Sequence, residues 1–283
     1  MIQIAHPKLT EDTVTKVWSS DSLVDARSAN VDRYERTFLR QAVCEFRFPT
    51  LLELGGTRPP ATFVAALRKE YPHLELTQEL ALGHGSEQTV TVNKHVFRSE
   101  KLNWTVSLKE SAFSIETNSY TTFPVMRERI LRVLSAATKI IDSEFFTRVG
   151  LRYINMIDAN ADPVNEGWIN HDLVAPLHAK VFTGISEYAG RLNLATDDGG
   201  CLLQHGLKFK SHPARALEDT EVDALPMYLI DIDAFRNGVA LEDSAAALDS
   251  MHAQAFDVFD WAIGDAARSY LATPKRSKAE VPR

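Results

Sequence analysis

Alternation of apolar and polar residues with a period of two is the clearest pattern in this sequence. In residues 41–48 the apolar residues Ala42, Cys44, Phe46 and Phe48 occupy every second position. Such alternation predicts a strand with one buried face, because successive side chains point to opposite sides of a sheet. Residues 145–157 predict a second strong strand. Further strands are expected over residues 74–82, 88–98, 102–108, 113–117, 187–196, 201–210 and 227–233.

Apolar residues at helical spacing predict two long helices. The first covers residues 123–141, where Thr121 or Thr122 can cap the helix and Pro124 suits its first turn. The second begins at Ser244 and runs to about residue 271, with an apolar stripe along one side. Shorter helices are expected over residues 61–71 and 168–178.

The same order of elements occurs twice along the chain. Residues 41–141 and 145–271 each predict a strand, a short helix, several antiparallel strands and a long helix. The opening strands also place Arg47 and Arg152 at matching positions, each next to an aromatic residue. We therefore expect an α+β fold built from two similar lobes, an internal duplication in which each lobe is an antiparallel sheet covered by a long helix, with the two sheets either separate or merged into one.

The expected domain organisation follows from this repeat. Residues 1–40 form an N-terminal lead-in, 41–144 the first α+β repeat, 145–272 the second, and 273–283 a basic disordered tail. The length of 283 residues and the hydrophobic content of 45% are typical of a globular protein. No apolar run approaches the roughly 18–20 residues of a membrane span, and the first residues lack the pattern of a signal peptide. With two cysteines only, a cytoplasmic protein is expected.

The net charge of −7 is unevenly distributed. Residues 216–262 contain eleven acids and one base, Arg236, and therefore carry −10. Within this stretch Asp219, Glu221 and Asp223 are candidates for docking a basic protein partner, although a solvated acidic face is the simpler interpretation. Residues 1–215 are balanced, which argues against a free-standing DNA-binding protein.

The sequence contains no motif that identifies a catalytic centre. Phosphate-binding loops, nucleophile elbows and zinc-protease motifs are all missing. Asp231 and Asp233 point the same way from one strand and are weak candidates for a metal site, but their alternation with isoleucine also fits a solvated face. His171 and His178 lie on one helical face, where a metal would need a third ligand. We expect no cofactor.

Arg47 and Arg152 are the most informative polar residues. A mid-strand arginine must reach water, an acid or an anion, because an unpaired buried charge is costly. One interpretation is a structural ion pair for each, Arg47 with Glu45 and Arg152 with an acid of the C-terminal half. The other is a pseudo-symmetric anion or partner-binding site between the lobes, with Tyr153 and Asn155 as polar neighbours.

Two motifs resemble those of a bacterial family of about this length, which is sporadically distributed and consists of conserved hypothetical proteins. They are Glu45-Phe46-Arg47-Phe48 in the opening strand and Arg148-Val149-Gly150-Leu151-Arg152-Tyr153-Ile154-Asn155 in the middle of the chain. The resemblance implies no catalytic residues. Its sporadic distribution implies a mobile gene, of the kind found in phage defence and toxin–antitoxin modules.

Three hypotheses about function follow. The first is a non-catalytic binding or regulatory component of a mobile bacterial module, which recognises a protein partner encoded nearby. The second is an enzyme with an inter-lobe site for a phosphate-bearing substrate, and the third is a saddle that binds nucleic acid. Nucleic acid is not expected as the sole partner, no membrane partner is expected, and a second copy of the chain is an alternative partner.

Overall fold

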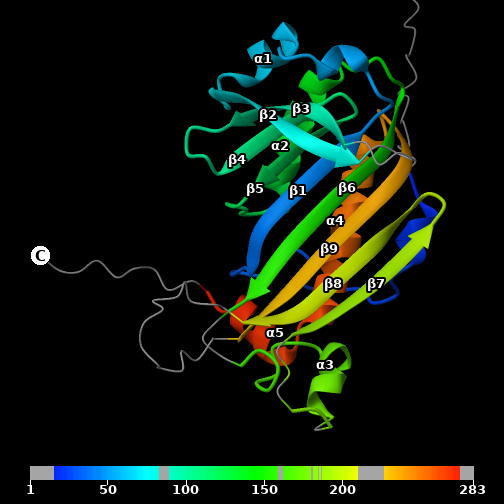
Figure 1. Ribbon diagram of the computed structural model, residues 1–283. Helices are drawn as coiled ribbons and strands as arrows, with labels where there is room; N and C mark the ends of the chain where they lie inside the picture. The colour runs from blue at the N-terminus through cyan, green and yellow to red at the C-terminus, as the bar shows by residue number, and fades with distance from the viewer. Residues whose placement is uncertain are drawn as a thin grey trace, which may run out of the picture.

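The computed structural model describes residues 16–82, 89–158, 162–179, 181–183, 185, 187–209 and 226–274. They form one antiparallel sheet of nine strands in the order β2-β3-β4-β5-β1-β6-β9-β8-β7, with helices on one side (Figure 1). The predicted α+β class is therefore confirmed. Among the described residues, no helix is both long enough and apolar enough to cross a membrane.

Most predicted elements form close to their expected bounds. The strands are β1 Leu39–Arg47, β2 His73–Leu82, β3 Thr89–Arg98, β4 Trp104–Lys109, β5 Ala112–Thr117, β6 Phe145–Ile157, β7 Tyr188–Thr196, β8 Gly199–Phe209 and β9 Pro226–Ala240. The helices are α1 Ala61–Leu67, α2 Phe123–Ala137, α3 His171–His178, α4 Ser244–Ala262 and α5 Asp265–Ala272, with short 3-10 helices η1 Ser19–Ser22 and η2 Leu52–Gly55.

The two halves of the chain share one sheet, which is the merged arrangement; the expectation of two lobes with a sheet each is wrong. The opening strands β1 and β6 pair with each other in antiparallel register, with Cys44 opposite Leu151 and Phe46 opposite Val149. Alternation within a strand predicts its buried face but not its neighbour. Pairing β1 with β6 satisfies the backbone groups of two strands that would otherwise be edges.

The hydrophobic core lies between the sheet and its helices. Helix α4 packs on β9 and β6, while α2 packs on β5 and against α1. At the centre of the core the Phe46 and Phe113 rings stack at 4.7 Å between centroids, and the Phe146 ring meets Phe46 edge-on at 5.0 Å. All three side chains are buried, and because they come from β1, β5 and β6, their packing helps to keep the strands of both halves in register.

Two predicted elements differ from the structure. The last helix ends at Ala262 and α5 starts at Asp265, because the chain turns at Gly264, where an added Cβ would lie 2.2 Å from the carbonyl oxygen of Gly167. Strand β9 has 15 residues and so extends beyond the predicted residues 227–233. It pairs with β6 on one side and β8 on the other, and these two partners hold its whole length extended.

The described part of the N-terminal lead-in is built into the fold. Trp18 is buried, and η1 packs against β8 and α4. A fully buried arginine, Arg236 of β9, links the sheet to the lead-in. Its Nη2 donates a hydrogen bond to Oδ1 of Asp21 over 2.6 Å. The same guanidinium donates to Ser250 and Gln254 of α4. The lead-in, the sheet and α4 therefore meet at one charged group.

Candidate functional site

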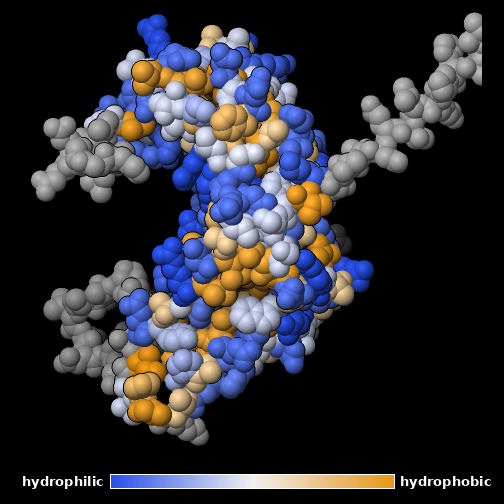
Figure 2. All heavy atoms as spheres, turned by 90° about the vertical axis from the view of Figure 1, so that its right-hand side faces the viewer, coloured by the Kyte–Doolittle hydropathy of each residue, from blue (hydrophilic) through white to orange (hydrophobic). Residues whose placement is uncertain are grey.

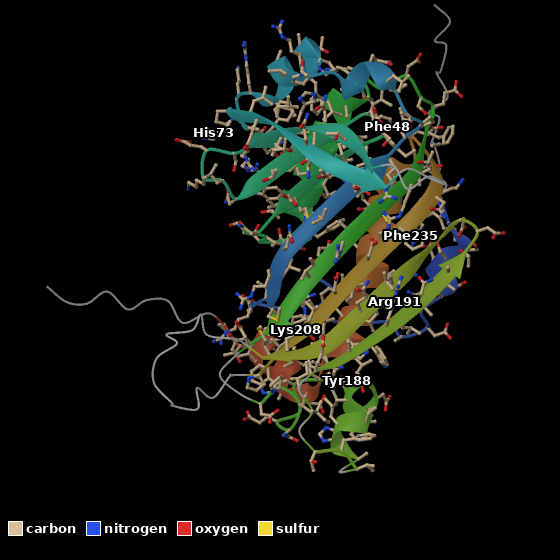
Figure 3. All side chains as sticks on the ribbon, in the orientation of Figure 1. Phe48, His73, Tyr188, Arg191, Lys208 and Phe235 are labelled. Carbon is tan, nitrogen blue, oxygen red and sulfur yellow. The ribbon has the colours of Figure 1, made fainter. Side chains whose placement is uncertain are left out.

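The sheet has helices on one side only, and its other side forms an open face. This open face consists of the side chains that point away from the helices, from all nine strands (Figures 1 and 3). Seen from the side, it is hollowed between the two ends of the molecule (Figure 2). Arg47 and Arg152, two of the predicted site residues, lie on this open face.

Arg148 organises the centre of the open face. Its Nη2 donates to Oδ2 of Asp233 over 2.7 Å, its Nη1 lies 3.9 Å from Oε1 of Glu45, and its guanidinium carbon lies 4.8 Å from the centre of the Phe235 ring. Gly150 makes room for this position, since a Cβ there would come within 2.4 Å of Nη1. The Arg-x-Gly spacing of the β6 motif thus lets an arginine lie flat across the sheet.

Arg152 and Arg47 each form an ion pair with an acid on the same face. Arg152 donates from Nε to Oδ1 of Asp231 over 2.8 Å, and Asp231 is buried. Arg47 donates from Nε to Oε1 of Glu45 over 2.6 Å, and the Arg47 side chain is 55% exposed. We call Glu45, Arg148, Arg152, Asp231 and Asp233 the central charge cluster.

Of the two interpretations of Arg47 and Arg152, the structure has the ion pairs, Arg47 with Glu45 and Arg152 with Asp231, and the two arginines do not converge on one anion. In the β1–β6 register Arg47 lies opposite Arg148, whereas Arg152 lies opposite Val43. Four residues along a strand separate these positions by about 13 Å. The antiparallel pairing moves equivalent residues of the two strands apart, so each arginine binds a local carboxylate instead.

The weak metal candidates are also engaged in ion pairs. Asp231 and Asp233 bind Arg152 and Arg148, and burial raises the pKa of Asp233 despite its arginine neighbours. The His171 and His178 rings stack with each other at 5.5 Å between centroids. Across the residues that the structure describes, no three histidine, cysteine or acidic side chains are grouped as metal ligands.

Most of the described acids in the acidic stretch pair with basic residues from other parts of the chain. Asp249 binds Arg127 of α2, and Asp257 binds Arg27 of the lead-in. Ion pairs within the chain therefore neutralise much of the negative charge that residues 216–262 were expected to present to a partner. The docking candidates Asp219, Glu221 and Asp223, and residues 275–283 of the predicted tail, lie outside the described residues.

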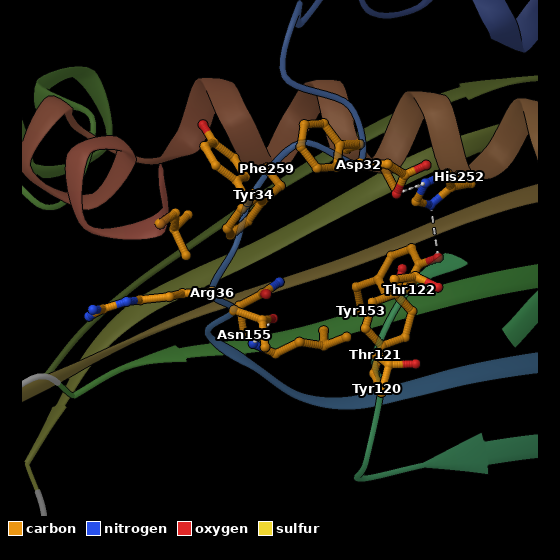
Figure 4. A pocket seen from close by; sticks show the side chains of 15 residues that line it. Asp32, Tyr34, Arg36, Tyr120, Thr121, Thr122, Tyr153, Asn155, His252 and Phe259 are labelled. Carbon is orange, nitrogen blue, oxygen red and sulfur yellow. Dashed lines mark hydrogen bonds and ion pairs between the residues drawn. The ribbon is translucent and has the colours of Figure 1, made fainter. Parts of the chain in front are cut away.

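Tyr153 and Asn155 point to the helix side of β6, away from the two arginines. They line a pocket of about 110 Å³ between β6, α4, the segment that leads into β1 and the loop before α2 (Figure 4). One wall is aromatic and is formed by Tyr34, Phe256 and Phe259. We call this space the helix-side pocket.

A chain of three polar groups closes one end of the helix-side pocket. Nε2 of His252 lies 3.3 Å from Oδ1 of Asp32, and its Nδ1 lies 3.0 Å from the hydroxyl oxygen of Tyr153. The imidazole is held by Phe123, whose ring stacks on it at 3.7 Å. Burial lowers the pKa of His252 and raises that of Tyr153. A neutral imidazole then donates a hydrogen bond from Nε2 to Asp32 and accepts one at Nδ1 from the Tyr153 hydroxyl.

The sequence analysis did not identify Asp32, His252 or Arg236 as site residues. Asp32 lies in the lead-in and His252 on α4, so 220 positions of sequence separate two groups that interact. No spacing rule connects such residues. One signal was present: Tyr153 and Asn155 were named as polar neighbours of the proposed arginine site, and both line the pocket instead.

No protein-family model matches this chain, and no curated protein is similar to it in sequence. The open face and the helix-side pocket are therefore the features of the molecule from which a function follows.

Proposed function

We propose that this chain is a non-catalytic binding component of a mobile bacterial module and that it recognises a protein partner in the cytoplasm with its open face. One observation carries the proposal. A nine-stranded sheet leaves one hollowed side without helices, and the charged side chains at the centre of that side, Arg148, Arg152, Asp231 and Asp233, are already held in ion pairs. Pre-positioned side chains lower the entropy cost of binding.

Charge indicates the chemistry of the partner. Arg191 of β7 and Lys208 of β8 are exposed on the open face, and neither forms an ion pair with another described residue. Arg47 is also largely exposed. These cations favour a partner with acidic side chains, which would accelerate association at low salt.

A protein fits the open face better than a nucleic acid does. The face also carries the carboxylates of Glu45, Asp231 and Asp233, which would repel phosphates along the centre of the sheet. The whole chain is acidic, with a net charge of −7. The enzyme hypothesis receives less support, because the two arginines proposed to hold a phosphate lie apart and are paired with acids.

The internal duplication remains a proposal as well. It is supported by the order of strands outward from the central pair, which is β1, β5, β4, β3, β2 on one side and β6, β9, β8, β7 on the other. On each side, the opening strand of one half of the chain (β1 or β6) lies next to the last strand of the same half (β5 or β9). Homologous sequences in which the two halves align residue by residue would test this proposal.

The experiment uses the tagged chain, expressed from its own gene cluster and purified with its bound proteins. The double variant Arg191→Glu and Lys208→Glu reverses two open-face cations. The matched control is Lys69→Glu with Lys139→Glu, since both lysines are exposed and lie on helix-side segments. We expect the open-face variant to lose a protein partner that the control retains.

Two outcomes would contradict the proposal. One is retention of the same partner by both double variants, which would place binding elsewhere. The other is a bound species that nuclease releases, which would favour the nucleic-acid hypothesis instead.

A further inference from the structure

The helix-side pocket is separate from the open face, and the proposed function makes no use of it. We propose that it binds a small organic cation, an ammonium group carried by a single aromatic ring. Three features of the pocket select such a ligand: the charge at one end, the aromatic walls and the size of the space.

Asp32 supplies the charge. Its side chain is 43% exposed, and it accepts a hydrogen bond from His252, whose pKa burial lowers. A neutral imidazole leaves the negative charge of the carboxylate uncompensated. Among the described residues Asp32 forms no ion pair with a lysine or arginine. A ligand cation would supply the missing positive charge in a partly dry site, where such a pair is stronger than in water.

The imidazole of His252 keeps Asp32 and Tyr153 in place. It is buried between the Phe123 ring and the edge of Phe256, so it has little freedom to turn. Backbone conformation also fixes Asp32, which has a positive φ of 56°. Such a conformation is uncommon outside glycine and is often found where a side chain must be held for function.

Aromatic side chains line both sides of the space next to Asp32. On the α4 side the Tyr34 and Phe256 rings stack at 5.8 Å between centroids. On the sheet side Tyr120 and Tyr153 meet edge-on at 5.9 Å. Ring faces attract cations, and the same surfaces bury an aromatic body. The amide of Asn155 adds a polar group near the middle of the pocket (Figure 4).

The volume limits the ligand to one ring. A cavity of about 150 Å³ holds benzene, and this pocket measures about 110 Å³ with an open end. A nucleotide is therefore too large.

An anionic ligand fits less well. The formal cation of the lining, Arg36, donates from Nε to the Thr273 carbonyl and from Nη2 to the Pro274 carbonyl, and its guanidinium lies 4.6 Å from the centre of the Tyr270 ring. Figure 4 shows this guanidinium directed away from Asp32 and His252. The charge that faces the pocket is thus negative.

Calorimetric titration with two probes of similar shape tests the inference. Tyramine carries the ammonium, and 4-ethylphenol lacks it. We expect the wild-type chain to bind tyramine at least tenfold more tightly than 4-ethylphenol. Asp32→Asn should remove this preference and leave the affinity for 4-ethylphenol unchanged, because the amide keeps the shape and loses the charge.

The open-face variant Arg191→Glu with Lys208→Glu is the control and should bind tyramine as the wild type does. The inference is therefore tested independently of partner binding. Equal affinity of the wild type for the two probes would overturn it, as would tighter binding of 4-hydroxyphenylacetate than of tyramine. Failure of both phenols to bind at millimolar concentration would also overturn it, without bearing on the open face.

Discussion

The buried ion pair between Arg236 and Asp21 gives the sharpest stability prediction. The Arg236 side chain is fully buried, and Asp21 is its carboxylate partner over 2.6 Å. Asp21→Asn keeps the shape of the side chain but removes the charge that compensates the guanidinium. Breaking a buried pair by removing one partner costs about 3–5 kcal/mol. Because Asp21 is 28% exposed and water can reach it, we expect a loss near the lower end, about 3 kcal/mol.

Removing the arginine instead should lower the free energy of unfolding by less than Asp21→Asn does. Arg236→Met eliminates the buried charge together with Nε, which has no hydrogen-bond partner in the described structure. The Asp21 carboxylate then keeps its contact with water. We therefore expect the double variant, Asp21→Asn with Arg236→Met, to be more stable than Asp21→Asn alone.

Equilibrium unfolding in urea, followed by tryptophan fluorescence, measures these differences. Trp18 is a suitable reporter, since its ring lies 5.9 Å from the Arg236 guanidinium carbon. Asp265→Asn is the control, because the Asp265 side chain is fully exposed and its ion pair with Arg268, screened by water, should shift the midpoint only slightly. A loss below about 1 kcal/mol for Asp21→Asn, or a double variant whose loss equals the sum of the two single losses, would refute the reasoning.

Two further predictions concern the open face and pH. Arg152→Ala leaves the buried Asp231 carboxylate without its partner and should cost about 3 kcal/mol, whereas Arg47→Ala breaks an exposed pair and should cost about 0–1 kcal/mol; equal losses in urea unfolding would contradict this. Burial lowers the pKa of three histidines in the native chain. At mildly acidic pH the unfolded chain therefore binds protons at these histidines that the native chain does not bind. Stability should therefore fall as the pH drops below about 6.5, by up to about 1.4 kcal/mol per pH unit for each proton. Urea unfolding at several pH values between 7.5 and 5.5 checks this slope, and constant stability would exclude it. The histidines are His95, His205 and His252.

The sequence by itself determined the elements and their buried faces. Strand β6 has the predicted bounds, and the apolar positions of the first opening strand, among them Cys44 and Phe46, face the core. Local periodicity is sufficient for this, because the side-chain period of a strand or helix depends on neighbouring residues alone. The same local rule placed Arg47 and Arg152 on the polar side of their strands.

Only the tertiary structure decided which strands pair and which side chains meet. The register between β1 and β6 places Arg47 opposite Arg148 and so separates it from Arg152. Local alternation already puts Arg152 and Tyr153 on opposite sides of β6, but only the packing of α4 and the lead-in on that strand forms the pocket around Tyr153. Asp32 reaches His252 only because the lead-in folds back onto α4. Contacts of this kind join residues far apart in the chain, and their free energy depends on the burial and charge of the assembled site, which no local pattern contains.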